Sequence, residues 1–216
     1  MIIHLGATHS LVSNWVGELR NIHVQGDRMR FRRNLERIGE VIGYEISKQL
    51  TSVKHTVTTP LGDAIVDTLA DQPVLATILR AGLPMHQGLM NYFDKADNAF
   101  LSAYRKHHPD GSFEICLEYM SCPDLSNRVL ILCDPMLATG ASLIQSVEHL
   151  KQAGHYSSLH IVCAIASQKG VDDVQAALPD ATIWCAAIDA EMNSKNYIVP
   201  GLGDAGDLAF GTKMQQ

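Results

Sequence analysis

From residue 74 onward, apolar residues gather in short and nearly uninterrupted runs. A strand that is covered on both faces of a sheet carries such a run, whereas a half-exposed strand alternates. Strands are therefore predicted at 74–79, 98–105, 128–134, 159–167 and 181–189. Helices are predicted between several of them, at 82–93, 141–154 and 169–178. The helix signals are Pro84 in a first turn, Gly154 as a stop and Pro179 as a stop.

The segment 27–50 has the pattern of one long amphipathic helix. Its apolar positions recur at helical spacing, and its opposite face is rich in arginine and glutamate, which we interpret as a solvated face. Gly39 and Gly43 lie four residues apart, so one side of this helix can accept a close neighbour. The apolar positions are Phe31, Leu35, Ile38, Ile42, Ile46 and Leu50.

An antiparallel hairpin is predicted around the Asp110-Gly111 turn signal. Residues 113–120 alternate apolar and polar, and they return along the strand at 98–105. We expect this hairpin arm, 104–120, to project from the sheet, where it is a candidate lid.

Alternation of strand and helix over 74–189 predicts a doubly wound, mainly parallel α/β core with helices on both faces. The 216 residues fit a single domain, 1–216. In open sheets of this class, ligands bind beyond the carboxyl ends of the strands. The segments that follow the predicted strands are therefore the first place to look for chemistry.

Composition and net charge argue against several classes of protein. Hydrophobic content of 46% and charged content of 19% are globular, and a net charge of −6 argues against a protein that coats nucleic acid or an anionic membrane. The N-terminal residues lack a signal-peptide pattern, and no apolar run is long enough to cross a bilayer. The five cysteines form no C-x-x-C pair, and the ten histidines show no ligand spacing. We expect free thiols in a reducing cytoplasm.

The strongest chemical signal is "VLILCDPMLATGAS", residues 129–142. An apolar strand ends at Asp134, and small residues then lead into a helix. Their backbone N–H groups are accessible, Thr139 and Ser142 add hydroxyl donors, and the helix N-terminus favours an anion. The pattern is not a Walker A loop. Taken alone, it is equally an ordinary strand-loop-helix with a threonine N-cap.

Two arginines follow other predicted strands. Arg80 comes after 74–79, and Arg105 comes at the end of the run 98–105. Guanidinium groups bind phosphate oxygens in a bidentate manner. Two arginines and a phosphate loop at one sheet edge therefore indicate a site for a phosphorylated ligand.

The C-terminal stretch "YIVPGLGDAGDLAFGTK", 197–213, contains G-x-G-x-x-G at Gly201, Gly203 and Gly206. A dinucleotide fingerprint requires a strand before the glycines and a helix after them. Pro200 precedes the first glycine, and we expect no helix after the last. The dinucleotide interpretation is therefore rejected, and the stretch is predicted to be an irregular loop that offers backbone groups to another ligand.

These motifs together resemble the uracil phosphoribosyltransferase family of type I phosphoribosyltransferases. "VLILCDPMLATGAS" resembles the phosphoribosyl-pyrophosphate (PRPP) motif, and "ILRAG", "AYR" and "YIVPGLGDAGD" follow the order and spacing of that family. The N-terminal "FRRNLERIGEVIGYE" is similar to its first long helix, so the resemblance spans nearly the whole chain. It implies a type I phosphoribosyltransferase fold with a C-terminal base-binding loop, 197–213.

The resemblance implies transfer of phosphoribosyl from PRPP to uracil, which yields UMP and pyrophosphate in pyrimidine salvage. Mg²⁺ would be bound mainly through PRPP, with Asp204 as a candidate protein contact. Asp134, Arg105 and Asp204 would be catalytic. The implied PRPP contacts are Arg80, Arg105, Asp134, Pro135, Met136, Leu137, Ala138, Thr139, Gly140, Ala141, Ser142 and Asp204. The implied uracil contacts are Tyr197, Ile198, Gly203, Asp204 and Ala205.

The family also implies a homodimer or higher homo-oligomer, and GTP as an effector in some members. Nucleic acid and membranes are not expected partners. Two alternatives stay open at this point: a phosphoribosyltransferase for another base, and a nucleotide sensor that keeps the fold without catalysis.

Overall fold

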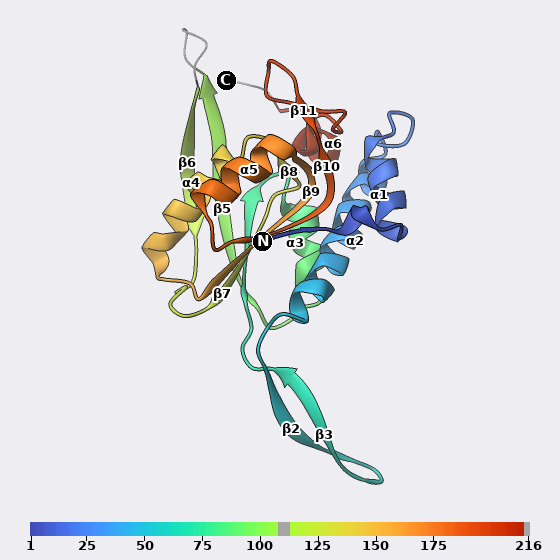
Figure 1. The fold of residues 1–216 in the computed structure, drawn as a ribbon, viewed down its shortest axis with the longest axis vertical. Coiled ribbons are helices and arrows are strands. Elements are labelled where there is room, and N and C mark those ends of the chain that lie inside the picture. Colours follow the sequence, from blue (N-terminus) through green and yellow to red (C-terminus); the bar gives the residue numbers. More distant parts are fainter. Residues whose placement is uncertain (108–112, 214–216) are drawn as a thin grey trace.

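The computed structural model describes residues 1–107 and 113–213, except for the side chains of 103–107 and 113–117. Its main sheet, shown in Figure 1, is built from strands far apart in the chain. The strands of this sheet are β1 (Ile2–His4), β4 (Val74–Leu79), β5 (Asp97–His107), β6 (Phe113–Ser121), β7 (Val129–Cys133), β8 (Met136–Leu137), β9 (Ser158–Ser167) and β10 (Thr182–Asp189). The helices that cover it are α1 (Leu11–Arg20), α2 (Arg28–Ser47), α3 (Leu83–Met90), α4 (Ala141–Leu150) and α5 (Gln168–Ala177).

The strand order is β1-β10-β9-β7-β4-β5-β6, and β8 pairs with β9 at the end of β7. Its neighbouring strands pair in parallel, except for β5 with β6, which are antiparallel. This confirms the predicted doubly wound sheet. The predicted strands and helices from 74 to 189 lie within a few residues of the observed ones.

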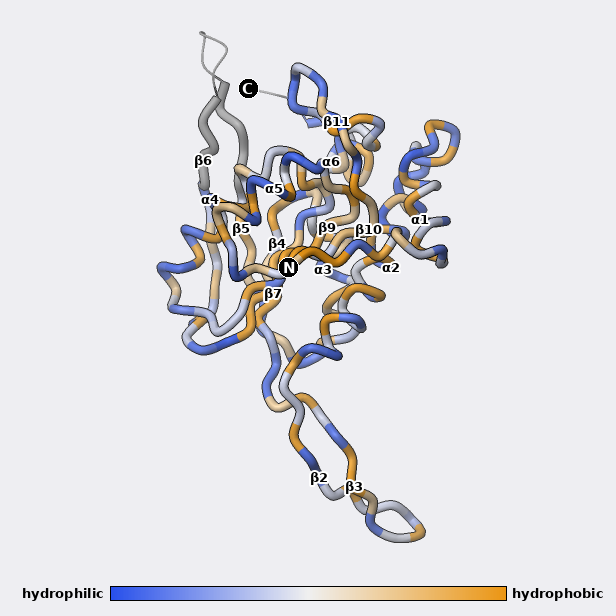
Figure 2. The backbone as a smooth tube through the Cα atoms, in the orientation of Figure 1, coloured by the Kyte–Doolittle hydropathy of each residue, from blue (hydrophilic) through white to orange (hydrophobic). Residues whose placement is uncertain are grey.

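Side chains of each central strand point alternately to the two faces of the sheet, and helices cover both. On one face, α1, α2 and α3 pack against Leu75, Ile131 and Val162. On the other, α4 and α5 pack against Leu130 and Ile161. Burial on both faces explains the continuous apolar runs, and Figure 2 shows the hydrophobic strands inside the more polar helices.

Helices α2 and α3 approach closely through glycines. A Cβ at Gly39 would lie 2.3 Å from the backbone oxygen of Met85, and one at Gly88 would lie 2.0 Å from that of Glu36. A side chain at either position would push the helices apart. The close neighbour expected for Gly39 and Gly43 is therefore confirmed.

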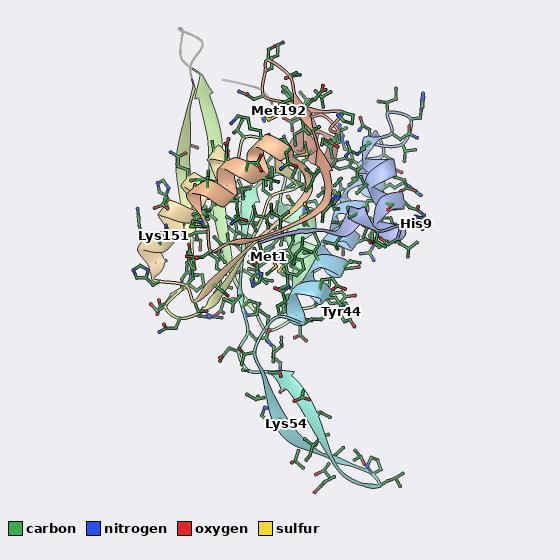
Figure 3. The ribbon with its side chains drawn as sticks, viewed as in Figure 1. Met1, His9, Tyr44, Lys54, Lys151 and Met192 are labelled. Atoms are coloured by element: carbon green, nitrogen blue, oxygen red, sulfur yellow. The ribbon has the colours of Figure 1, made fainter. Side chains whose placement is uncertain are left out.

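Several elements before residue 74 were not predicted from the sequence pattern. Strand β1 adds an edge to the sheet, α1 packs on α2, and β2 (Ser52–Thr59) with β3 (Gly62–Leu69) forms a second antiparallel hairpin. This hairpin extends away from the sheet, as the position of Lys54 in Figure 3 shows. Every residue of β2 is exposed, so neither of its faces packs on the core. A strand without a buried face leaves no apolar pattern to detect.

The predicted hairpin arm 104–120 is confirmed in its pairing. Strands β5 and β6 pair in antiparallel register, with a shift between Ser102 and Ala103. Its turn, 108–112, lies outside the described residues. The arm reaches toward the same end of the molecule as the C-terminal segments (Figure 1).

The C-terminal stretch is more regular than we expected. Strands β11 (Glu191–Met192) and β12 (Ile198–Val199) pair in antiparallel fashion, and a short helix, α6 (Ala205–Phe210), follows the glycines. The expectation that no helix follows was wrong, because Asp204 caps a helix of only six residues. The dinucleotide interpretation still fails, since β12 is a two-residue antiparallel strand and not part of a parallel βαβ unit.

Within residues 1–107 and 113–213, the structure has no helix with the length and apolar character that a bilayer crossing requires.

Candidate active site

The carboxyl ends of β4 and β7 lie side by side at one edge of the sheet. The two strands are parallel, and Thr77 is the partner of Cys133 in their register. Arg80 follows three residues after Thr77, and Asp134 follows directly after Cys133. The fold therefore brings together the two strand ends that carry the predicted arginine and acid.

The predicted phosphate cradle is a tight loop between β7 and α4. Its N-cap is Gly140, in the left-handed conformation with φ +77°, and no side chain caps the helix. Thr139 is therefore not the N-cap, although its Oγ1 accepts a long hydrogen bond from the Ala141 N–H, at 3.4 Å. Uncapped N–H groups at a helix N-terminus leave donors for an anion.

Helix α5 fixes the shape of this loop. The Ser167 hydroxyl donates to the Ala138 carbonyl at 2.6 Å. A Cβ at Gly140 would lie 2.5 Å from Val174 Cγ2, and one at Gly170 would lie 2.2 Å from the Ala138 oxygen. The loop is therefore packed tightly from behind, and its position depends on glycine at both contacts.

The Asp134 carboxylate is half-buried and is oriented by its own loop, because Oδ1 accepts the Met136 N–H at 3.2 Å. The preceding residue, Cys133, is fully buried, and burial raises the pKa of its thiol to about 12. A thiol that stays protonated is neither a nucleophile nor a metal ligand at neutral pH. Asp134 is thus the acidic group at this strand end. The cradle residues Pro135, Met136, Leu137, Ala141 and Ser142 follow it in the same turn and first helical residues.

Arg80 contacts the C-terminal segment. Its Nη2 donates to Asp207 Oδ1 at 3.0 Å and to the Gly211 carbonyl at 3.1 Å. A Cβ at Gly206 would be 3.2 Å from Asp204 Oδ1 and 3.8 Å from Arg80 Nη2. Arg80 and Asp204, 124 positions apart in the printed sequence, therefore face the same small volume beside Gly206.

The predicted uracil contacts lie along the C-terminal stretch from just before β12 to the start of α6. Ile198 is buried in β12, whereas Tyr197 is half-exposed and receives support from Asn193, whose Oδ1 accepts the Tyr197 N–H at 3.0 Å. Gly203 is exposed at φ +98° with free space where a side chain would be, and Ala205 begins α6. The loop thus presents backbone groups near the residues that Arg80 contacts.

Asp204 has two roles in the local structure. Oδ1 accepts the Asp207 N–H at 2.9 Å, and Oδ2 lies 3.6 Å from Lys213 Nζ. Its side chain remains 38% exposed, so an oxygen can still face a ligand. Among the described residues, no three His, Cys, Asp or Glu side chains come together in a group that could bind a metal ion.

Arg105 is placed only in part. It lies in β5 opposite Ile115 of β6, and its side chain lies outside what the structure describes. The implied pyrophosphate contact of Arg105 therefore stays a prediction.

Several residues that touch the C-terminal loop were not predicted from the sequence, among them Arg32 on α2, which donates to the Ala209 carbonyl at 2.7 Å. Arg20 on α1 and Gln25 in the following turn both donate to backbone oxygens of the loop. The buried positions Val12, Val16 and Leu19 have helical spacing and are the signal that could have revealed α1. Nothing in the neighbouring sequence indicates that Arg20 and Gln25 contact the loop.

A family model for uracil phosphoribosyltransferase matches residues 6–212. The chain belongs to the uracil phosphoribosyltransferase family.

Individual relatives agree. A uracil phosphoribosyltransferase from Porphyromonas gingivalis is 54% identical over 214 residues, which cover 99% of each chain. One from Methanococcus vannielii is 39% identical and covers 90% of this chain and 83% of its own. The structure of the AQ2163 protein from Aquifex aeolicus superposes with a TM-score of 0.87 at 27% identity, with both chains fully covered.

Membership in the uracil phosphoribosyltransferase family confirms the resemblance seen in the motifs. The activity is that of a uracil phosphoribosyltransferase, a pentosyltransferase of pyrimidine salvage. A hypoxanthine phosphoribosyltransferase from Staphylococcus aureus shares the fold at a TM-score of 0.50 and 13% identity. The uracil phosphoribosyltransferase motifs therefore stand on a phosphoribosyltransferase fold that proteins with other base specificities also use.

Proposed function

We propose that the chain binds PRPP across the ends of β4 and β7 and transfers its phosphoribosyl group to uracil in the C-terminal loop. The single observation that carries this proposal is the uncapped N-terminus of α4 behind a loop of small residues. The 5′-phosphate binds the backbone N–H groups from Ala138 to Ser142, with the Thr139 and Ser142 hydroxyls as further donors. Asp134 accepts hydrogen bonds from the ribose hydroxyls.

Arg80 and Arg105 bind the pyrophosphate. As the bond between C1′ and the pyrophosphate oxygen breaks, positive charge develops on the ribose and negative charge on the leaving group. A uracil nitrogen then bonds to C1′ and loses its proton, which the released pyrophosphate or water accepts. Guanidinium groups placed at the leaving oxygens stabilise that charge more strongly than water does. Asp207 and the Gly211 carbonyl hold Arg80 at the mouth of the site before PRPP binds.

The C-terminal loop recognises the base. Uracil presents alternating N–H and C=O groups along its edge, and the backbone around Ile198, Gly203 and Ala205 offers matching acceptors and donors. Cytosine reverses the groups at N3 and at position 4 and leaves their partners unpaired, which is costly in a closed site. Tyr197 and Asp204 border this surface, and Gly203 allows close approach.

Mg²⁺ would be bound mainly through PRPP, as the resemblance implied. The described part of the chain has no protein cage for the ion, and the hard donor that we propose is the half-exposed Asp204 carboxylate. This donor set fits an ion whose other ligands are phosphate oxygens and water. When bound, Mg²⁺ would neutralise part of the pyrophosphate charge.

A homodimer or higher homo-oligomer is also proposed, as the resemblance implied. The β2–β3 hairpin projects with exposed apolar side chains, among them Leu61, 100% exposed, and Ile65, 73% exposed. A second copy of the chain would cover them. Light scattering of the purified protein measures its mass and tests this. GTP activation is kept as a prediction, tested by adding GTP to the activity assay.

We also propose a reducing location such as the cytoplasm. Cys133, Cys163 and Cys185 are free and buried. Free thiols of this kind are typical of proteins that fold where disulfides do not form.

The deciding experiment measures UMP formation from uracil, PRPP and Mg²⁺, with cytosine, hypoxanthine and orotate assayed in parallel. Turnover of uracil alone supports both the transfer chemistry and the proposed base loop. Turnover of another base would leave the phosphate cradle intact and refute the proposed loop. Binding of UMP without turnover of any base would favour a nucleotide sensor.

A further inference from the structure

An ion pair joins the first helix to the end of β10. Arg20 Nη1 and Nη2 donate to Asp189 Oδ2 and Oδ1, each at 2.7 Å. The Asp189 side chain is 8% exposed and that of Arg20 is 22% exposed. A bidentate fork of this kind fixes both groups in orientation as well as in distance.

The same two side chains hold one peptide of the C-terminal loop. Arg20 Nη1 donates to the Gly201 carbonyl at 3.0 Å, and the Gly201 N–H donates to Asp189 Oδ2 at 3.0 Å. Gly201 is buried at φ +55°, and a Cβ there would lie 2.2 Å from the Ile198 oxygen. The N–H and the carbonyl of Gly201 are thus both hydrogen-bonded to the same ion pair, which holds this residue of the loop in place.

The side chain of Gln25 holds the next residue of the loop, Leu202. Gln25 Nε2 donates to the Leu19 carbonyl at 2.7 Å and to the Leu202 carbonyl at 3.1 Å. Residues 201 and 202 lie between Ile198 and Gly203, whose backbone groups are the proposed uracil contacts. The N-terminal segment therefore holds the middle of the base-binding loop from behind.

We propose that Arg20 and Asp189 are positioning residues. They place the base-binding loop where its backbone groups can form hydrogen bonds with uracil. The proposal rests on the uracil role of the loop given under Proposed function. A hydrogen-bonding surface for a small planar base tolerates little displacement, because each contact depends on distance and angle. Displacing the loop therefore weakens uracil recognition while the phosphate cradle, held separately by α5, keeps its shape.

The test compares Arg20→Lys with Arg30→Lys. Lysine keeps the charge but cannot donate in a fork. Arg30 on α2 is a matched control, since it makes a bidentate pair at 2.6 and 2.8 Å with Glu18 on α1, the helix that carries Arg20. Its side-chain hydrogen bonds go to Glu18 and not to the loop. For Arg20→Lys we expect the uracil KM to rise about tenfold, as a free-energy loss near 1.4 kcal/mol would produce. The PRPP KM should stay within about twofold, as should both constants in Arg30→Lys.

An Arg20→Lys enzyme with a uracil KM within about twofold of wild type would overturn the proposal, as would an equal rise in both KM values. If Arg20→Lys does not fold, Gln25→Ala is measured in its place. It removes one hydrogen bond to the loop, and the uracil KM should then rise about threefold with the PRPP KM unchanged. An unchanged uracil KM in Gln25→Ala would count against the proposal in the same way.

Gly203→Ala distinguishes a failure of the positioning role from a failure of the proposed uracil role of the loop. Its added methyl meets nothing closer than Leu208 Cδ1 at 4.0 Å, but its φ of +98° strains any other residue. A higher uracil KM in Gly203→Ala together with a normal one in Arg20→Lys would refute the positioning role alone. Normal values in both would refute the uracil role of the loop as well.

Discussion

Replacement of Gly140 by alanine tests the phosphate cradle most directly. Gly140 is at φ +77°, a conformation that costs an L-residue about 1–2 kcal/mol. Its new Cβ would lie 2.5 Å from Val174 Cγ2, so the loop or α5 must move. Overpacking of this kind costs about 1–3 kcal/mol. Together, we expect Gly140→Ala to lower the free energy of unfolding by about 2–5 kcal/mol.

The same change should displace the phosphate-binding N–H groups. We therefore expect the PRPP KM to rise at least about tenfold with a nearly unchanged uracil KM. Urea unfolding and initial-rate kinetics measure the two effects. Gly17→Ala is the stability control, because Gly17 lies inside α1 with nothing within 4 Å, and alanine there should stabilise the helix by about 0.5–1 kcal/mol.

A double-mutant cycle separates steric overlap from backbone strain. Val174→Ala makes room for the new methyl, so Gly140→Ala should cost less in that background. We expect a coupling energy of about 1–3 kcal/mol. A coupling below about 0.5 kcal/mol, or a wild-type PRPP KM in a folded Gly140→Ala enzyme, would refute the packing argument.

Three further predictions follow from single sites. Asp204→Ala should abolish turnover but lower the free energy of unfolding by only about 1 kcal/mol, the value of a helix cap. Measurements of kcat and urea unfolding test the two effects. A near-normal kcat would contradict the proposed role of Asp204. Arg80→Lys should raise the PRPP KM about tenfold and leave the uracil KM unchanged, because lysine cannot bind phosphate oxygens in a bidentate manner; equal changes in both constants would argue for general damage. Burial lowers the pKa of His160 to about 4, and its Nδ1 accepts the Trp184 Nε1–H at 3.0 Å. The unfolded chain binds this proton at a higher pH than the folded chain does, because its histidine has the ordinary pKa of about 6.5. The free energy of unfolding should therefore fall by about 3 kcal/mol as the pH drops from 6.5 to 4. His160→Asn keeps an acceptor without titrating, and urea unfolding of this variant should lose that part of the pH dependence.

Much of the fold was predictable because its core strands are buried on both faces. Such strands carry continuous apolar runs, and the observed β4, β7 and β10 lie within two residues of the predicted ranges. The phosphate cradle was equally local, since its strand, loop and helix N-terminus are consecutive in the chain. These features depend on neighbouring residues alone, so a pattern can reveal them.

Elements without a buried face were missed. Strand β2 is exposed along its whole length, and β3 is half-buried at scattered positions. Leu69, at the end of β3, packs against the core, but the rest of the hairpin has no buried apolar face whose pattern could predict it. Helix α6 was missed for another reason: a six-residue helix among glycines forms because Asp204 caps it and Arg32 donates to the Ala209 carbonyl at 2.7 Å.

By itself, the sequence indicated which residues we propose for the chemistry: the acid after β7, the small residues of the predicted cradle and the glycines of the predicted base loop. Only the tertiary structure decided how they meet. Arg20 and Asp189 are 169 positions apart, and Arg80 and Asp207 are 127 apart. Pairs at such separations leave no local pattern, because they form only when the sheet order places α1, β4 and the chain after β10 at one edge. The contacts that position the loop are therefore a property of the folded chain.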